Sequence, residues 1–240
     1  MIENASRQVP VSHAASPESS RDAQRGEAER SDTWAGLHVL ADDDPRWRWS
    51  PPEQARAACD GGAAVVQLRV KHATDRQALA WGEAIREATR RAGLRFVMND
   101  RFDLALALEA DAVHLGQDDL PPARVRAVAG RALALGRSTH DDVELTRALS
   151  EPVDYVAFGP VFGTTSKQTT HGARGLARLA AAAVRVSPRP LVAIGGVDAG
   201  NIAGVVEAGA RGAAVLSAVA TAADPVAAIE QLVRAFAGMR

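Results

Sequence analysis

Short apolar runs alternate with longer segments of helical period from Leu37 to the end of the chain. A short, continuously apolar run is typical of a strand that is buried on both faces of a parallel sheet. The runs that predict such strands are LHVLA (37–41), AVVQL (64–68), RFVMN (95–99), AVHL (112–115), ALALG (132–136), DYVAFG (154–159), LVAIGG (191–196) and AAVLS (213–217).

Segments with helical spacing of apolar residues separate these runs. They predict helices near residues 52–60, 75–92, 102–109, 121–129, 141–149, 174–186, 199–208 and 224–237. Connections of this length between parallel strands occur in a doubly wound sheet or in a closed barrel. Because the chain has eight such strand-helix units, we predict a single α/β domain over residues 34–240, a (β/α)8 TIM barrel.

Polar residues and glycines gather directly after the predicted strands, whereas compact turns such as Gly62-Ala63 precede them. In a (β/α)8 barrel the carboxyl ends of all strands lie on one face. Side chains far apart in the sequence are therefore expected to meet around one mouth.

The first 33 residues have a different composition. They are rich in Ser, Arg and Glu and nearly lack large apolar side chains. Such a segment cannot bury enough surface to offset the entropy of ordering it. We predict a disordered N-terminal extension over residues 1–33.

Composition and charge exclude several classes of protein. The chain is 47% hydrophobic with a net charge of −1, which does not favour a nucleic-acid or anionic-membrane partner. No run approaches the roughly 20 apolar residues of a membrane span, and the N-terminus lacks an apolar signal core. The single Cys59 cannot form an internal disulfide. We expect a cytoplasmic protein, and a homo-oligomer is compatible with the sequence.

Two cations and an amide alternate along the end of the second predicted strand, in VVQLRVKHA. Gln67, Arg69 and Lys71 are two residues apart, so a strand would place them on one side. An Arg fork and a Lys point charge suit a polyphosphate. The alternative is a solvated strand end.

Carboxylates follow the third and fourth predicted strands. Asn99 and Asp100 end the third strand, and Asp118 and Asp119 follow the fourth. Two carboxylates on neighbouring loops suit Mg²⁺, which keeps several waters and relies on substrate phosphates. The alternative makes Asp100 a helix N-cap and Asp118-Asp119 an ordinary loop. His114 lies within a strand and is expected to be packed or hydrogen-bonded.

Hydroxyls and glycines follow the last four strands. Ser138 is expected to bond phosphate, because the segment GRSTH lacks the elbow sequence of a nucleophilic serine. Gly196 and Ser217 follow strands seven and eight, where such barrels often hold a phosphate. The long loop after strand six suits an anion-binding lid, with a flexible surface loop as the alternative. Its candidate residues are Thr164, Thr165, Ser166 and Lys167.

These groups define two separable anion sites. The carboxylates with Arg69, Lys71 and Lys167 suit a diphosphate, and Gly196 with Ser217 suits a monophosphate. A barrel that binds both is expected to be a transferase or a lyase acting on phosphorylated small molecules.

At these same residues the chain resembles the thiamine phosphate synthase family. The likeness covers about residues 37–222 and is carried by six motifs in order: QLRVK, ND with the later HLGQDD, GRSTH, GPVFGTTSK, AIGG and VLSA. The resemblance implies an Mg²⁺-dependent transferase of thiamine biosynthesis, which joins a hydroxymethylpyrimidine diphosphate to a thiazole monophosphate.

The resemblance also implies roles for individual residues. Asp100 and Asp119 would hold Mg²⁺. The residues that would bind the pyrimidine diphosphate are Gln67, Arg69, Lys71, Asn99, Ser138 and Lys167, and four of them, Arg69, Lys71, Ser138 and Lys167, are the expected catalytic residues. The residues on the thiazole phosphate side would be Thr164, Ser166, Gly196, Leu216 and Ser217, and Thr165 is also placed among the substrate-binding residues.

The chain departs from the family pattern at Gly163, Asp118 and Arg137, where Pro, Glu and an aliphatic residue are common. The loop ADDDPRWRWSPP after the first strand is also unusual. A thiazole tautomerase on the same fold, with His140 as its catalytic residue, is the nearest alternative, although the retained diphosphate and Mg²⁺ residues argue against it. A non-catalytic phosphate-binding regulator is a further alternative, with residues 1–33 as its candidate interaction segment.

Overall fold

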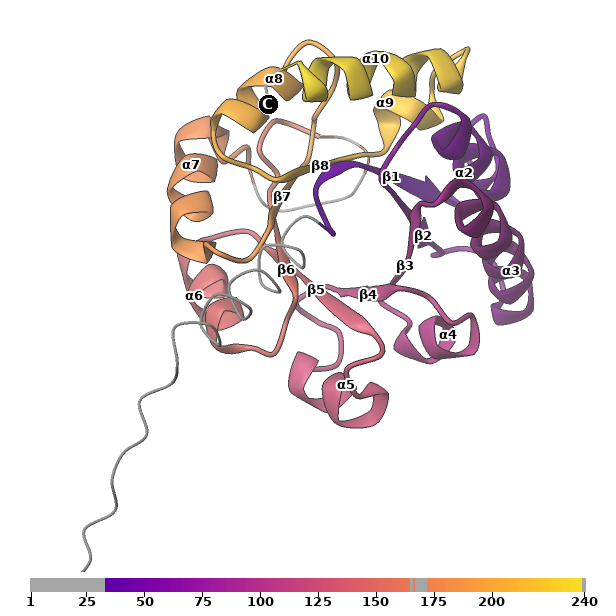
Figure 1. The fold of residues 1–240 in the computed structure, drawn as a ribbon, viewed down its shortest axis with the longest axis horizontal. Coiled ribbons are helices and arrows are strands. Elements are labelled where there is room, and N and C mark those ends of the chain that lie inside the picture. The colour runs from indigo at the N-terminus through magenta and orange to yellow at the C-terminus, as the bar shows by residue number, and fades with distance from the viewer. Residues whose placement is uncertain (1–32, 165, 167–171, 239–240) are drawn as a thin grey trace, which may run out of the picture.

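Eight parallel strands close into a barrel in chain order, and the first strand pairs with the last. The computed structural model describes residues 33–164, 166 and 172–238. Figure 1 looks along the barrel and shows a central ring of strands with the helices outside it. The prediction of a (β/α)8 barrel is confirmed.

The elements alternate along the chain as the hydrophobic pattern predicts. The strands are β1 (Gly36–Asp42), β2 (Val65–Arg69), β3 (Arg95–Asn99), β4 (Ala112–Leu115), β5 (Ala134–Thr139), β6 (Tyr155–Phe158), β7 (Leu191–Ile194) and β8 (Gly212–Val215). The helices are α2 (Pro51–Asp60), α3 (Asp75–Ala92), α4 (Phe102–Ala107), α5 (Pro122–Ala129), α6 (Asp142–Ser150), α7 (Gly175–Val186), α8 (Ile202–Glu207), α9 (Ser217–Ala220) and α10 (Pro225–Ala237).

Several strand ends differ from the prediction by one or more residues, and two of these differences concern proposed site residues. β5 begins at Ala134 and continues to Thr139, past the apolar run that was expected to end at Gly136. The polar end of this strand is stable because its hydroxyls are paired; Thr139 Oγ1 donates to the main-chain oxygen of Ala157 at 2.9 Å. Ser217 was expected to end the eighth strand, but it begins the short helix α9 instead.

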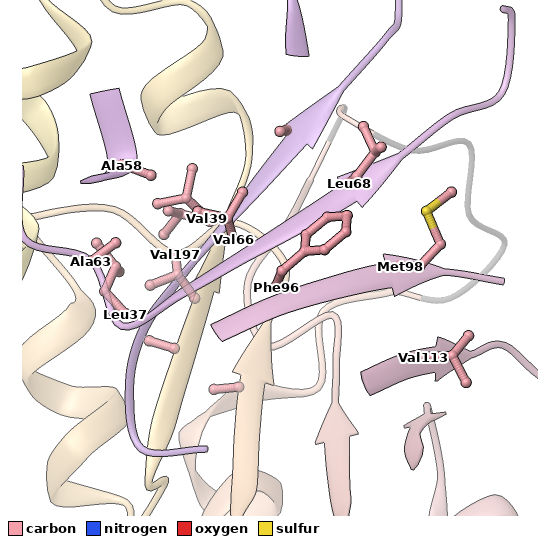
Figure 2. Close-up of a cluster of buried hydrophobic side chains, with 14 of the residues drawn as sticks. Leu37, Val39, Ala58, Ala63, Val66, Leu68, Phe96, Met98, Val113 and Val197 are labelled. Atoms are coloured by element: carbon pink, nitrogen blue, oxygen red, sulfur yellow. The ribbon is translucent and has the colours of Figure 1, made fainter. Parts of the chain in front are cut away.

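Strand alternation divides the core into two layers. Outward-facing side chains of the strands form one cluster with buried helix residues such as Ala58, and Figure 2 labels Leu37, Val39, Phe96 and Met98 among its members. A second cluster, which includes Leu40 and other inward-facing residues, fills the barrel. Burying each such Leu, Val or Phe contributes about 1.5–3 kcal/mol, so the hydrophobic pattern that defines the strands also closes the barrel.

Inside the barrel, at its amino-terminal end, Trp34 stacks on Tyr155 with ring centroids 4.8 Å apart. Trp34 is buried and lies just before β1. The two rings fill the amino-terminal part of the barrel, so the interior is a packed core. The site can therefore form only at the carboxyl ends of the strands.

Local capping signals fix where several helices begin. Thr74 Oγ1 accepts a hydrogen bond from the Gln77 main-chain nitrogen at the start of α3, and the Asp141 side chain caps α6. Each cap satisfies main-chain donors that the first helical turn leaves unpaired.

Some predictions fall outside the described ranges. These are residues 1–32 of the N-terminal extension, and Thr165 and Lys167 of the proposed lid. Among the helices of the described ranges, none combines the length and the apolar character that crossing a bilayer would need.

Candidate active site

The guanidinium of Arg69 is held in place at the end of β2 by Asp42, the last residue of β1. Arg69 Nη1 donates to Asp42 Oδ2 at 2.5 Å, and Trp47 Nε1 donates to Asp42 Oδ1, also at 2.5 Å. Asp42 is only 1% exposed, so the ion pair is shielded from water on the carboxylate side. Sequence reasoning missed Asp42, although its position at a strand carboxyl end was the available signal.

Asp43 fixes the loop that carries Lys71. Its carboxylate accepts hydrogen bonds from the main-chain nitrogens of Lys71 (2.7 Å), His72 (2.9 Å) and Ala73 (2.8 Å). The loop after β2 is thereby tied to the loop after β1. The Lys71 side chain then reaches Asp100, where Nζ lies 2.5 Å from Oδ2.

Asp100 adopts a left-handed backbone conformation, with φ of 64°. Its main-chain nitrogen donates to the His114 oxygen at 2.8 Å, which anchors the turn after β3 to β4. A non-glycine residue in this region is uncommon, and when the surrounding structure holds it there it often marks a functional site.

The carboxyl groups of Asp100 and Asp119 are hydrogen-bonded to each other. Burial acts to raise the pKa of Asp100, but hydrogen bonds from Lys71 and Asp119 outweigh it and lower the pKa overall. Burial raises the pKa of Asp119, and the neighbouring Asp100 adds to this. The two pKa values move in opposite directions because like charges at close range make it unfavourable for both carboxyls to ionise.

Asp119 is oriented by the loop after β4. Its Oδ2 accepts a hydrogen bond from the Gly116 main-chain nitrogen at 2.6 Å. The Gly116 oxygen in turn accepts a hydrogen bond from the buried guanidinium of Arg137 on β5. One proposed metal ligand is therefore supported by an arginine on the next strand.

Gln67 and Asn99 form a buried pair on β2 and β3. Gln67 Nε2 donates to Asn99 Oδ1 at 2.8 Å. This bond orients the two amides, which leaves the Asn99 nitrogen as a donor next to the carboxylates.

Ser138 lies on β5 and is bonded from two sides. Its hydroxyl lies 2.8 Å from His114 Nε2, and its main-chain oxygen accepts from Gln117 Nε2 at 2.5 Å. His114 also contacts the Tyr155 hydroxyl, at 3.0 Å. The prediction that His114 is packed and hydrogen-bonded is confirmed.

A cavity opens on the β5–β8 side of the mouth. It brings together six of the residues that were singled out from the sequence: Ser138, Thr164, Ser166, Gly196, Leu216 and Ser217. His140 also lines it, and its Nδ1 lies 2.8 Å from Glu144 Oε2.

Gly196 lies where no side chain fits. Its φ is 65°, and an added Cβ would overlap the Gly163 oxygen and lie 2.8 Å from Phe162 Cβ. The loop after β7 therefore packs directly on the loop after β6, and Asn201 Nδ2 donates to the Gly196 oxygen at 2.9 Å. Within the described residues the Gly196 N–H has no acceptor, so it is available to a ligand in the cavity.

Two mouth loops meet above the site. Arg46, in the loop after β1, is paired with Asp44 at 2.7 Å and donates from Nη2 to the main-chain oxygen of Ser166 at 3.5 Å. The unusual first loop is therefore in contact with the proposed lid.

The mouth thus holds two chemically different regions. One contains the paired carboxyls with Lys71 and Arg69, and the other contains hydroxyls and a main-chain N–H around the cavity. In the described part of the chain there is no cluster of three or more His, Cys, Asp or Glu side chains that could hold a metal by itself. Any divalent cation here would take further ligands from water and substrate.

Comparison with known proteins gives a consistent result. A family model described as thiamine monophosphate synthase matches residues 37–219. A thiamine-phosphate synthase from Chloroflexus aurantiacus is 48% identical over 176 residues, which are 73% of this chain and 81% of that protein. A thiamine-phosphate synthase from Methanoculleus marisnigri is 43% identical over 196 residues, 82% of this chain and 92% of that protein.

A solved structure agrees with the sequence matches. The thiamine phosphate pyrophosphorylase from Pyrococcus furiosus superposes with a TM-score of 0.78 at 33% identity, and the match covers 88% of this chain and 98% of that one.

Proposed function

We infer the activity of this protein from its family: the chain belongs to the thiamine monophosphate synthase family. It joins 4-amino-2-methyl-5-pyrimidinylmethyl diphosphate to a thiazole monophosphate, giving thiamine phosphate and diphosphate. The observation that carries this proposal is that one barrel mouth holds two chemically different regions, both suited to phosphate groups, with Ser138 lining the cavity and bonded to β4. The substrates are phosphorylated small molecules, and we place the protein in the cytoplasm.

The diphosphate is proposed to bind on the β2–β4 side. Arg69 presents a guanidinium whose orientation is set by Asp42, and Lys71 contributes an ammonium from a loop held by Asp43. Arg forms forked hydrogen bonds with phosphate oxygens, whereas Lys acts as a point charge. Lys167, which lies outside the described residues, is proposed as a third cation on this side.

Mg²⁺ is the proposed cofactor, held by Asp100 and Asp119. The pair fits a divalent cation because each ionised carboxyl disfavours ionisation of the other, and a bound cation would favour the ionised form of both. Two carboxylates with waters and phosphate oxygens form a typical Mg²⁺ ligand set. When bound, the ion would neutralise the negative charge that gathers on the departing diphosphate.

The thiazole monophosphate is proposed to occupy the cavity on the β5–β8 side. The Gly196 N–H and the Ser217 hydroxyl would supply hydrogen-bond donors to phosphate oxygens, and Thr164 and Ser166 line the same cavity. This places the thiazole ring toward Ser138, facing the pyrimidine.

The reaction needs no protein nucleophile. The bond between the pyrimidine methylene and the diphosphate oxygen breaks, and its electron pair leaves with the diphosphate. The electron-rich aminopyrimidine bears the resulting methylene cation until the thiazole nitrogen donates its lone pair to form the new C–N bond. The protein contributes by positioning the two rings and by stabilising the leaving group.

A thiazole tautomerase would use the same fold but would not require the diphosphate site. His140 does line the cavity, and its pairing with Glu144 would orient it. The carboxyl pair with Lys71 and Arg69 has no purpose in such an isomerase, and this favours the synthase.

One assay tests the proposal. The full-length protein is given both substrates, with and without Mg²⁺, and thiamine phosphate is measured. We expect product only when both substrates and Mg²⁺ are present. Product formation without the pyrimidine diphosphate, or isomerisation of a thiazole carboxylate phosphate alone, would overturn it.

A further inference from the structure

A hydrogen-bonded chain of three side chains crosses the barrel interior beneath the cavity. The Tyr155 hydroxyl lies 3.0 Å from His114 Nδ1, and His114 Nε2 lies 2.8 Å from the Ser138 hydroxyl. Tyr155 is 1% exposed and His114 is also buried, whereas Ser138 lines the cavity. The chain therefore links a fully buried phenol to a side chain that faces the substrate.

Strand register explains why this contact forms. His114 on β4 is level with Gly136 on β5, which is level with Tyr155 on β6. A Cβ at position 136 would overlap the Tyr155 ring and lie 2.6 Å from His114 Nδ1. Glycine at the middle strand thus lets two large side chains meet across it, and Ser138 lies two residues further along the same strand.

The direction of both hydrogen bonds follows from the Tyr155 hydroxyl, which can act as a donor. Burial raises the pKa of Tyr155, so its phenol stays protonated. Within the described residues the phenol has no hydrogen-bond partner except His114 Nδ1. A buried O–H without an acceptor costs about 1–3 kcal/mol, so Tyr155 donates and Nδ1 accepts.

The direction of the second hydrogen bond is then determined. A neutral imidazole that accepts at Nδ1 carries its proton on Nε2, so His114 donates to the Ser138 oxygen. The other tautomer, or a doubly protonated ring, would place an N–H at Nδ1 and leave the Tyr155 proton without an acceptor. Ser138 Oγ has no second partner among the described residues, so its own proton remains for a substrate acceptor at the mouth of the barrel.

We propose that Tyr155 is a positioning residue, which acts through the Nε2–H tautomer of His114 to hold the Ser138 hydroxyl as a hydrogen-bond donor toward an acceptor atom of the pyrimidine diphosphate. This proposal rests on the proposed function for the identity of the substrate. The tautomer of His114 does not depend on it, and it can be measured on the protein alone.

Nitrogen NMR tests the tautomer directly. The full-length protein is labelled with ¹⁵N-histidine, and the signals of His114 are identified among the six histidines by their loss in the His114→Gln variant. We expect an unprotonated Nδ1 and a protonated Nε2 in the wild type, and a partial or complete change to Nδ1–H in Tyr155→Phe. A wild-type ring with its proton on Nδ1, or on both nitrogens, would overturn the proposal.

Kinetics then test whether Tyr155 acts through Ser138. Tyr155→Phe keeps the ring that stacks on Trp34 and removes only the donor, so kcat should fall about 10-fold, as expected for one lost hydrogen bond, with the thiazole phosphate KM unchanged. In a Ser138→Ala background the same change should have no further effect on kcat. Equal losses in both backgrounds would contradict the positioning role.

Thr139→Val is the matched control. Thr139 is also buried on β5, and its hydroxyl donates to the Ala157 oxygen at 2.9 Å, outside the three-residue chain. Any effect it has on kcat should be the same with and without Ser138→Ala. Thermal melting of each variant shows that the fold is retained. If the wild type makes no thiamine phosphate, the proposed function fails, while the tautomer measurement still decides the direction of the hydrogen bonds.

Discussion

The Lys71 side-chain nitrogen lies 2.5 Å from Asp100 Oδ2, across the ends of the neighbouring strands β2 and β3. The Lys71 ammonium, which suits a phosphate, is therefore in contact with a proposed metal-binding carboxylate when neither phosphate nor metal is bound. If Asp100 held Mg²⁺, Lys71 would lie beside the ion-binding carboxylate, on the side of the mouth proposed for the diphosphate. Lys71 and the metal are thus expected to act on the same leaving group.

Asp100→Asn should lower kcat by about 100-fold at saturating Mg²⁺, the order of loss seen when one group stabilising the transition state is removed. Asparagine tolerates the left-handed backbone of this position, so the melting temperature should hardly change. Steady-state rates and thermal melting check both statements. Asp103→Asn is the control. Asp103 is an exposed residue of α4 that pairs with Arg101, and this variant should keep the wild-type kcat. Unchanged turnover in Asp100→Asn would contradict the metal assignment.

Gly196→Ala should raise the KM for the thiazole phosphate by about 10-fold or more, as expected for a lost or displaced hydrogen bond to a charged group. The added methyl would collide with Phe162 and the Gly163 oxygen and push the N–H away from the cavity. Gly163→Ala, where a Cβ meets nothing within 4 Å, is the matched control. A rise confined to the pyrimidine KM would mean that the two substrate sites have been exchanged.

The free energy of unfolding should decrease as the pH falls from about 6.5 toward 4. Burial lowers the pKa of His38 to about 4, although the Trp34 main-chain oxygen 2.9 Å away partly opposes this. Below pH 6.5 the unfolded chain binds a proton that the folded protein does not, so up to about 3 kcal/mol is lost across this range. Urea unfolding at a series of pH values measures it.

The His38→Gln variant isolates this contribution from those of the carboxylates. Its amide can still donate to Trp34, but it does not titrate. The difference in unfolding free energy between the two proteins should therefore change with pH between 6.5 and 4. Parallel curves would show that His38 is not the responsible group.

Arg137→Met should destabilise the protein by about 3 kcal/mol, because removing this buried arginine leaves the charge of the partly buried Glu151 uncompensated. Arg137 is 3% exposed, and its Nε lies 3.1 Å from Glu151 Oε2 in ion-pair geometry. The Arg137→Met/Glu151→Gln double variant should recover part of the loss in urea unfolding. A double variant at least as unstable as the single one would contradict this account.

The same substitution should also weaken Mg²⁺ binding. Arg137 donates to the Gly116 oxygen, and the Gly116 nitrogen orients Asp119. Without the arginine, the Mg²⁺ concentration that gives half-maximal rate should rise. An unchanged value would show that the loop after β4 holds Asp119 by itself.

Several parts of the site could be predicted from local sequence alone. Each strand and helix is encoded by its own apolar period, and the parallel topology sends every strand end to the same face. For this reason residues as distant as Ser138 and Ser217 were expected in one mouth, and both line the same cavity. The paired carboxyls of Asp100 and Asp119 follow from the same rule, since their strands are neighbours.

Other features depended on the assembled barrel. Asp42 looked like one of three acidic residues in a loop, and only the pairing of β1 with β2 shows that it holds Arg69. Arg137 looked like a departure from the family pattern, and its partners Glu151 and Gly116 lie on other segments.

The apolar period of the sequence by itself determined the order and type of the elements, because it is a local property that each segment carries. Only the tertiary structure decided which side chains touch across the strands, such as His114 and Tyr155 over Gly136. Register sets these contacts, and register is fixed by closure of all eight strands together rather than by any one of them.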